Sequence, residues 1–316
     1  MAIEHKSPRI LILRRDNIGD LVCTTPLVAA LRGQLPGAWI GVLVNTYNAE
    51  VLANNTTLDE VFVYEKMKHR RKGALALFKD RLKLLSSIRG RKLDAVLVPA
   101  PSPQSLKVAK NLGARSVLVS TADAGHEVER SFQVGRELGI TGEPGKLRVF
   151  PDAAVVAGLQ AQLGAGPFIA VHISARRPKQ RWPLYAELVR ELARDSQVML
   201  LWAPGPADDP RHPGDDASAA RIVDAVGDSN VVPVPTPDLA TLIAALSLAR
   251  LVVCPDGGAM HLAAALGKPV VALFGDSPVE RWRPWGVEHR VLRPDSRDLA
   301  DLPLAPVLGA VKELAG

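Results

Sequence analysis

Short apolar runs alternate along the chain with longer segments in which apolar residues recur at helical spacing. The run 9–14 places four apolar residues between two arginines, and 39–44 is almost wholly apolar. Such runs are typical of strands that are buried on both faces of a parallel sheet. The same pattern predicts strands at 60–64, 94–99, 115–120, 168–173, 197–202, 231–233, 251–254 and 270–274. Helical spacing predicts helices at 20–35, 73–89, 105–112, 126–138, 153–163, 183–194, 217–226, 239–249, 259–266 and 304–314, and a short helix that ends within 50–54.

Strands that alternate with helices indicate a doubly wound parallel sheet with right-handed crossovers. The alternation is interrupted by a tract rich in Gly and Pro around 142–151 and then starts again. The chain of 316 residues has the length of two ordinary domains. We therefore predict two Rossmann-like α/β domains, 1–150 and 151–302, followed by a helix within 303–316.

The composition is that of an ordinary globular protein, with 47% apolar and 23% charged residues. No apolar run approaches the roughly 20 residues that span a bilayer, and residues 1–8 lack the apolar centre of a secretory signal. Cys23 and Cys254 both lie within apolar patterns, which favours inert, reduced thiols. We therefore expect a cytoplasmic protein.

The positive net charge of +6 is concentrated in one segment. From Lys66 to Lys92 there are eleven Lys or Arg residues and one acid, Asp80. Neither zinc-ligand spacing nor an RNA-binding aromatic strand accompanies it, so we expect no nucleic-acid partner. A face that binds substrate phosphates, a face for an anionic membrane surface and a solvated helix face all fit this pattern.

The stretch 255–269 has the order strand end, glycine pair, helix, which is how α/β proteins build an anion site. Gly257 and Gly258 allow close approach of the backbone to a ligand, and the helix start offers unpaired N–H groups. Asp256 and His261 add polar specificity. A tight turn with a satisfied histidine is the simpler interpretation of this stretch alone.

Three further strand ends of the second domain carry polar residues that would reach the same edge of the sheet. They are Ser174 with the basic cluster 176–181, Asp208, and Thr236. Cations beside a helix N-terminus suit a diphosphate. Neither a Walker-type motif nor metal-ligand spacing is present in the sequence, so we expect no metal and no cofactor.

In the first domain, Asp16 and Asp20 follow the first strand. Asp20 at the start of a helix could be an N-cap, or it could be a catalytic carboxylate at a strand end, where ligands bind in open α/β sheets. One base that faces one diphosphate suggests a single displacement in which the base takes an acceptor hydroxyl proton.

Four segments together resemble the lipopolysaccharide heptosyltransferases of glycosyltransferase family 9. They are Arg15–Asp20 followed by Thr25–Pro26, His126–Arg130, Arg181–Pro183 and Asp256–His261, in this order over nearly the whole chain. The resemblance implies a GT-B type fold with two Rossmann-like domains that face a central cleft. In this family the C-terminal helix packs back on the first domain. The resemblance also implies inverting, metal-independent transfer of a heptose from ADP-L-glycero-β-D-manno-heptose to an inner-core sugar of lipopolysaccharide.

The resemblance assigns roles residue by residue. Asp20 matches the catalytic base, and Asp256 matches the acid that holds the donor sugar hydroxyls. The other donor-side matches are Ser174, Gly257, Gly258 and His261 near the phosphates and Asp208 near the ribose, and we expect Thr236 to join this donor site. Gly257 stands where relatives often have Thr. Gln180 stands where the family usually has a phosphate-binding Lys, and we expect Lys179 or Arg181 to take its place.

On the acceptor side, Asp16 and Asn17 lie beside the base, and the basic segment supplies candidate phosphate ligands, Lys66, Lys68, Arg70 and Arg71. The implied acceptor is an anionic glycolipid at the inner face of the cytoplasmic membrane, where a monomeric enzyme would associate peripherally. His126 with Glu127 is interpreted as a helix-start pair, and Trp182 as core packing.

Three other functions remain open. A family 9 enzyme could use another nucleotide sugar, or a protein or small-molecule acceptor, because the motifs constrain the donor phosphates more than the rest. A sugar-nucleotide epimerase on the same fold would carry paired glutamates after the glycine turn, where this chain has Met260, His261 and Leu262. A charge-driven binder without turnover would show a steep salt dependence.

Overall fold

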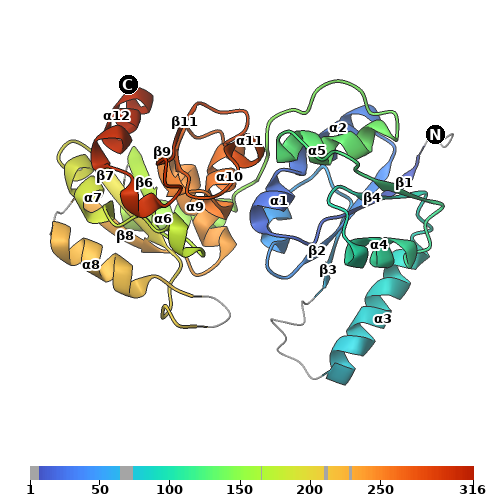
Figure 1. Ribbon diagram of the computed structural model, residues 1–316. Coiled ribbons are helices and arrows are strands. Elements are labelled where there is room, and N and C mark those ends of the chain that lie inside the picture. The colour runs from blue at the N-terminus through green and yellow to red at the C-terminus, as the bar shows by residue number, and fades with distance from the viewer. Residues whose placement is uncertain (1–6, 65–73, 165, 210–212, 228–229) are drawn as a thin grey trace. The chain divides into compact units, whose positions relative to one another are not determined.

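The computed structural model describes residues 7–64, 74–164, 166–209, 213–227 and 230–316 (Figure 1). Its contacts divide the chain into two compact units, Met1–Arg148 and Val149–Gly316. The predicted acceptor residues Lys66, Lys68, Arg70 and Arg71 lie outside the described residues.

The first unit contains a five-stranded parallel sheet with the order β3-β2-β1-β4-β5. Its strands are β1 Arg9–Leu13, β2 Trp39–Asn45, β3 Glu60–Tyr64, β4 Ala95–Val98 and β5 Ser116–Val119. The chain starts at the centre with β1, adds β2 and β3 on one side, and then returns to add β4 and β5 on the other. The carboxyl ends of β1 and β4 therefore form the topological switch point, which is the usual ligand site of such sheets.

Helices cover both faces of this sheet (Figure 1). They are α1 Ile18–Val22, α2 Thr25–Gln34, η1 Ala49–Leu52, α3 Ala74–Gly90, α4 Pro103–Lys110 and α5 Glu127–Arg136. Helices α2 and α5 pack together, whereas α3 and α4 supply Ile88 and Ala109 to a core on β1, β2 and β4.

The single helix predicted at 20–35 is two helices, α1 and α2, which are separated at Cys23 and Thr24. Pro26 has no N–H and therefore cannot donate to the carbonyl of Val22, as a continuous helix requires. The Thr24 hydroxyl donates to the carbonyl of Asp20 at 2.9 Å, and the Thr25 hydroxyl donates to that of Val22 at 2.7 Å. These bonds close α1 early, so Asp20 lies in a one-turn helix directly beside the end of β1.

The second unit contains a six-stranded parallel sheet with the order β11-β10-β9-β6-β7-β8. Its strands are β6 Phe168–His172, β7 Gln197–Trp202, β8 Val231–Pro235, β9 Ala249–Pro255, β10 Val270–Leu273 and β11 His289–Leu292. The sequence pattern missed β11, because this edge strand has only half-buried or exposed residues and no apolar run. The switch point lies between β6 and β9.

The helices of the second unit are α6 Ala153–Leu163, η3 Pro178–Gln180, α7 Tyr185–Ala193, α8 Asp216–Val226, α9 Leu239–Leu248, α10 Gly258–Ala265, α11 Val279–Trp282, η4 Leu299–Asp301 and α12 Leu304–Ala315. Trp182 is buried against Tyr185, and its indole N–H donates to the carbonyl of Leu302 at 2.8 Å. Its predicted role in core packing is confirmed.

Helix α12 belongs to the second unit. It lies against α7, β9, β10 and β11. Val307, Ala310 and Val311 are buried in the same core as the strands β6, β7, β9 and β10. Burial of this apolar stripe fixes the helix on its own sheet. Among the described residues, no helix is long and apolar enough to cross a membrane.

Candidate functional site

The turn after β1 is organised around a buried arginine. Arg14 has no exposed surface, and its guanidinium contacts three carboxylates. Its Nη2 donates to Asp20 Oδ1 at 3.3 Å and also to Glu127 Oε1, while its Nη1 lies 3.7 Å from Asp16 Oδ2. Its Nε donates to the carbonyl of Asp20 at 3.1 Å. Arg14 therefore holds both the backbone and the side chain of Asp20 in place.

The charge of Arg14 is maintained by these partners. Burial alone would lower its pKa, but the carboxylates of Asp20, Glu127 and Asp16 outweigh that effect and raise the pKa above its ordinary value. Glu127 is the first residue of α5 and is itself buried. Its second carboxylate oxygen lies 3.6 Å from Arg130 Nε.

His126 and Glu127 have separate roles, and the predicted pairing of the two is therefore incomplete. His126 is the N-cap of α5, where its Nδ1 accepts from the N–H of Val128 at 3.1 Å and its own N–H donates to Glu129 at 2.8 Å. His126 thus starts the helix as predicted. Glu127 instead reaches Arg14, a contact between residues 113 positions apart that no local pattern in the sequence indicates.

Asp20 is the third residue of α1, whereas Asn17 is the N-cap. The backbone N–H and the side-chain amide of Asn17 both donate to Asp20 Oδ2, at 3.1 and 3.0 Å. The Asp20 side chain nevertheless keeps 13% of its surface exposed. A fixed carboxylate with an accessible edge can accept a proton from a bound hydroxyl.

A polar hollow of about 310 Å³ opens at the switch point of the first sheet. It is lined by Leu13, Arg15, Asp16, Asn17, Tyr64, Ala100, Ser102, Gln104 and Ser105. Asp16 and Asn17, two of the predicted acceptor residues, therefore share one hollow at the carboxyl ends of β1 and β4. The turn is held from below by buried Asn45, whose side-chain amide donates to the carbonyls of Arg15 and Asp16 at 2.9 and 3.1 Å.

In the second unit, the predicted donor residues lie at the carboxyl ends of four adjacent strands, β9, β6, β7 and β8. Ser174 Oγ, after β6, accepts from the N–H of Ala203 at 2.9 Å. Thr236, after β8, donates its hydroxyl to the carbonyl of Trp202 at 2.8 Å. Both hydroxyls therefore tie neighbouring strand ends together. Asp208 is exposed in the loop that follows β7.

Asp256 follows β9 and is the most enclosed acid of this edge, with 9% of its side chain exposed. Gln180 Nε2 donates to Asp256 Oδ2 at 3.0 Å and to Ser277 Oγ at 3.1 Å. Burial raises the pKa of the Asp256 carboxyl, and the hydrogen bonds of Ser277 and Gln180 and the charge of Arg177 only partly oppose this shift.

The cation beside Asp256 is Arg177, and not Lys179 or Arg181. Arg177 Nη2 lies 3.8 Å from Asp256 Oδ2 and donates to Ser277 Oγ, and its Nη1 lies 3.2 Å from Asp276 Oδ1. Half of its side chain remains exposed and accessible to an anion. Lys179 and Arg181 are exposed, and Arg181 Nε donates to the carbonyl of Ala175 at 3.3 Å.

The turn η3 sets this arrangement, because it buries Gln180 and turns its neighbours outward. A Cβ at Gly275 would overlap the carbonyl oxygen of Lys179, so glycine is needed where the two segments meet. Gln180, Arg177 and Ser277 were not among the predicted site residues. The available signals were the basic cluster 176–181 and the place of Gln180 at the family's usual Lys position, and neither reveals the geometry of the turn.

The helix α10 starts directly after Gly257, and no side chain caps its first turn. The N–H groups of Gly258 and Ala259 in this first turn are the groups predicted to face an anion. His261, in the first turn, is buried, and its ring meets Trp282 edge-on at 5.9 Å between centroids. Among the residues that the structure describes, no group of three or more His, Cys, Asp or Glu residues could hold a metal ion.

Known proteins are similar to this chain over most of its length. The family model for glycosyltransferase family 9 (heptosyltransferase) matches residues 112–303. Lipopolysaccharide heptosyltransferase 3 of Escherichia coli K12 is 24% identical over 84% of this chain and 82% of its own length. Lipopolysaccharide heptosyltransferase 1 of Escherichia coli O18:K1:H7 is 22% identical over 97% of this chain and 98% of its own.

Solved structures share the fold. A glycosyl transferase of family 9 from Veillonella parvula covers 99% of this chain and 98% of its own with a TM-score of 0.86 at 19% identity. The Escherichia coli heptosyltransferase WaaC with ADP covers 97% of this chain and 99% of its own with a TM-score of 0.80 at 20% identity. The predicted fold of two Rossmann-like domains of the GT-B type is confirmed.

Proposed function

Because the chain belongs to glycosyltransferase family 9 (heptosyltransferase), we propose that it transfers a heptose from ADP-L-glycero-β-D-manno-heptose to an inner-core sugar of lipopolysaccharide. Its two relatives named above are lipopolysaccharide heptosyltransferases. The observation that carries the proposal is Asp20, a carboxylate that is fixed by Arg14 and by Asn17 and is still accessible. Asn17 itself lines the polar hollow.

In the proposed reaction, Asp20 accepts the proton of an acceptor hydroxyl as the hydroxyl oxygen attacks the anomeric carbon of the heptose. The bond between that carbon and the phosphate oxygen breaks, and ADP leaves with the electron pair. Attack opposite the leaving group inverts the anomeric configuration. The hydrogen bonds from Arg14 and Asn17 orient Asp20 for this step.

On the donor side, the proposal gives Asp256 the sugar hydroxyls and gives the N-terminus of α10 and Arg177 the diphosphate. The helix dipole, the N–H groups of its first turn and a half-exposed guanidinium stabilise the negative charge that develops on ADP. The protein itself supplies this stabilisation, and we propose that transfer requires no metal ion. Ser174, Thr236 and Asp208 border the nucleotide.

We further propose that the enzyme acts as a cytoplasmic monomer at the inner face of the membrane, on an anionic glycolipid. The described part of α3 presents Lys79, Arg81, Lys83 and Arg89 as exposed cations. Such a basic face is suited to phosphorylated lipid headgroups.

The test offers the protein ADP-heptose together with lipid A that carries Kdo, and follows ADP release and the mass of the glycolipid. We expect ADP release that depends on the acceptor, and a mass increase of one heptose. UDP-glucose, GDP-mannose and ADP-glucose in parallel reactions should give no product. Product from one of these donors and not from ADP-heptose would instead identify a family 9 enzyme with another sugar.

A further inference from the structure

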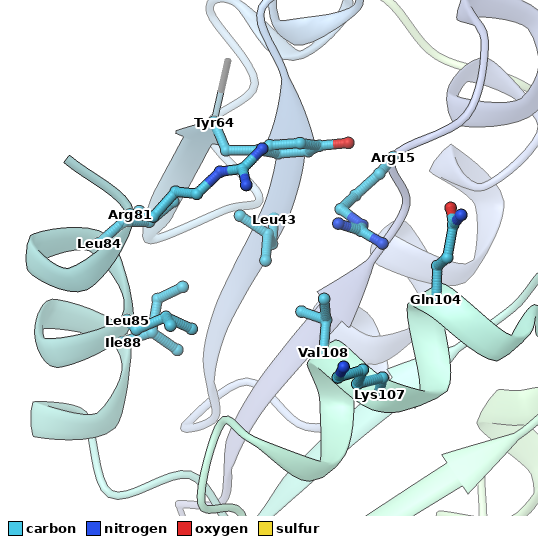
Figure 2. A pocket seen from close by; sticks show the side chains of 10 residues that line it. All are labelled: Arg15, Leu43, Tyr64, Arg81, Leu84, Leu85, Ile88, Gln104, Lys107 and Val108. Atoms are coloured by element: carbon cyan, nitrogen blue, oxygen red, sulfur yellow. The ribbon is translucent and has the colours of Figure 1, made fainter. Parts of the chain in front are cut away.

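A second cavity of the first unit lies beside the polar hollow, between α3 and α4 (Figure 2). Its volume is about 450 Å³, within the usual size range of small-molecule sites. Helix α3 supplies one wall, α4 supplies the facing wall, and β2 supplies the floor. The lining residues are Arg15, Leu43, Tyr64, Arg81, Leu84, Leu85, Ile88, Gln104, Lys107 and Val108.

The walls of this cavity are apolar. Leu43 and Ile88 belong to the buried core, but Leu84, Leu85 and Val108, which pack against that core, remain half-buried at the surface of the cavity. Apolar side chains that converge on a hollow from two helices favour an apolar occupant over water. A sugar alone would leave these apolar side chains without apolar contacts.

The rim of the cavity is cationic. Arg15, Arg81 and Lys107 are among the ten lining residues, and none of the ten is acidic. The guanidinium of Arg15 lies 5.0 Å from the centre of the Tyr64 ring, and Figure 2 shows both side chains at the same end of the cavity. The Nε of Arg15 is buried and has no hydrogen-bond partner among the described residues. An anion at this end would satisfy that donor.

The apolar cavity continues into the polar hollow. Arg15, Tyr64 and Gln104 line both spaces. The polar hollow also contains Asn17, which donates to Asp20. A ligand that extends through both spaces would place its polar end beside the proposed base and its apolar end between α3 and α4.

We propose that the cavity between α3 and α4 binds a single alkyl chain of a phosphorylated amphiphile, with the phosphate held at Arg15 and Arg81 beside Tyr64 (Figure 2). This inference rests on the proposed function in that the amphiphile is the acceptor, whose sugar occupies the polar hollow. The enzyme thereby binds part of the lipid anchor of its acceptor and not the sugar alone.

The test is calorimetric titration of the full chain with hexyl, octyl and decyl phosphate below their micelle concentrations. Affinity should rise about fourfold for each methylene added, up to the capacity of the cavity. Inorganic phosphate and decyltrimethylammonium should bind at least about 100-fold more weakly than decyl phosphate. Inorganic phosphate lacks the alkyl chain, and decyltrimethylammonium lacks the phosphate.

Matched variants on α3 distinguish binding in the cavity from attraction to the general charge of the helix. Leu85→Trp should fill the cavity and abolish the dependence on chain length, whereas Leu82→Trp, at an exposed position, should retain it. Arg81→Ala should weaken decyl phosphate about tenfold, whereas Lys83→Ala, which removes a cation that does not line the cavity, should change it less than twofold. Val108→Trp fills the cavity from α4 and serves if Leu85→Trp does not fold.

Affinity that is independent of chain length, or unchanged in both Leu85→Trp and Val108→Trp, would overturn the inference. Because the titration involves no transfer, its outcome is separate from that of the proposed function. Heptose transfer without binding of decyl phosphate would refute only the proposed alkyl-chain site. Binding of decyl phosphate without heptose transfer would refute only the proposed reaction.

Discussion

Arg14 and Glu127, 113 positions apart in the chain, form an ion pair in which neither side chain has more than 2% of its surface exposed. The pair joins the end of β1 to the start of α5 and holds the group that contacts Asp20. Buried charges depend on their partners, because removal of one leaves the other without compensation in a medium of low dielectric constant.

Glu127→Ala should therefore destabilise the protein by about 3–5 kcal/mol in urea unfolding. Glu143→Ala is the matched control, because Glu143 pairs with Arg136 at 3.5 Å on the surface and its side chain is 85% exposed. The control should leave the unfolding midpoint unchanged, since exposed pairs contribute little. Equal midpoints for the two variants would show that the buried pair contributes no more to stability than the exposed pair.

The raised pKa of Asp256 predicts a particular pH dependence. A carboxyl whose pKa is higher in the folded state than in the unfolded state stabilises the fold at pH values below the ordinary Asp pKa. This contribution to the free energy of unfolding is lost as pH rises through the folded-state pKa. The stability advantage of Asp256→Asn over the wild type should therefore grow as pH rises from about 4 to 7. Chemical unfolding at several pH values measures it, and an advantage that shrinks with pH would contradict the shift. The variant should also raise the KM for the donor.

His172, at the end of β6, is buried, and burial lowers its pKa from 6.5 to about 4. The neutral ring contributes stability that is fully present above pH 6.5 and is lost as pH falls through the folded value. The wild type should lose up to about 3 kcal/mol between pH 6.5 and 4 on this account. His172→Gln should remove that slope in urea unfolding while changing stability less at pH 8. An identical slope in both proteins would exclude His172 as its source.

Much of the fold follows from local pattern, because strands and helices need only apolar residues at the right spacing. The family and the enzyme class predicted from the four motifs are confirmed. Two features differ from prediction because apolar spacing does not show them. Pro26 breaks the first helix, and the edge strand β11 has no apolar run.

The site was less accessible to prediction than the fold. Asp20 and Asp256 were identifiable from strand ends and motif, but their partners come from distant or locally irregular segments. Arg14 looked like an ordinary charged strand end, and its pairing with Glu127 required the tertiary structure. In the cluster 176–181, the resemblance favoured Lys179 or Arg181 because they flank Gln180 at the family's usual Lys position, whereas the turn η3 places Arg177 beside Asp256.

The role of Asp20 as the base is tested most directly by Asp20→Asn against Asp16→Asn. Asn keeps the size of the side chain and its ability to accept the hydrogen bond of Arg14, but it cannot take a proton. Asp16 lines the polar hollow and is 43% exposed, so its variant controls for loss of a negative charge near the acceptor.

The measurement is kcat for ADP release with ADP-heptose and lipid A carrying Kdo, together with the Kd of each variant for ADP-heptose. We predict that Asp20→Asn lowers kcat by about 100- to 10,000-fold with the Kd unchanged within about twofold, and that Asp16→Asn lowers kcat less than tenfold. Turnover by Asp20→Asn within tenfold of the wild type would contradict the role of Asp20 as the general base.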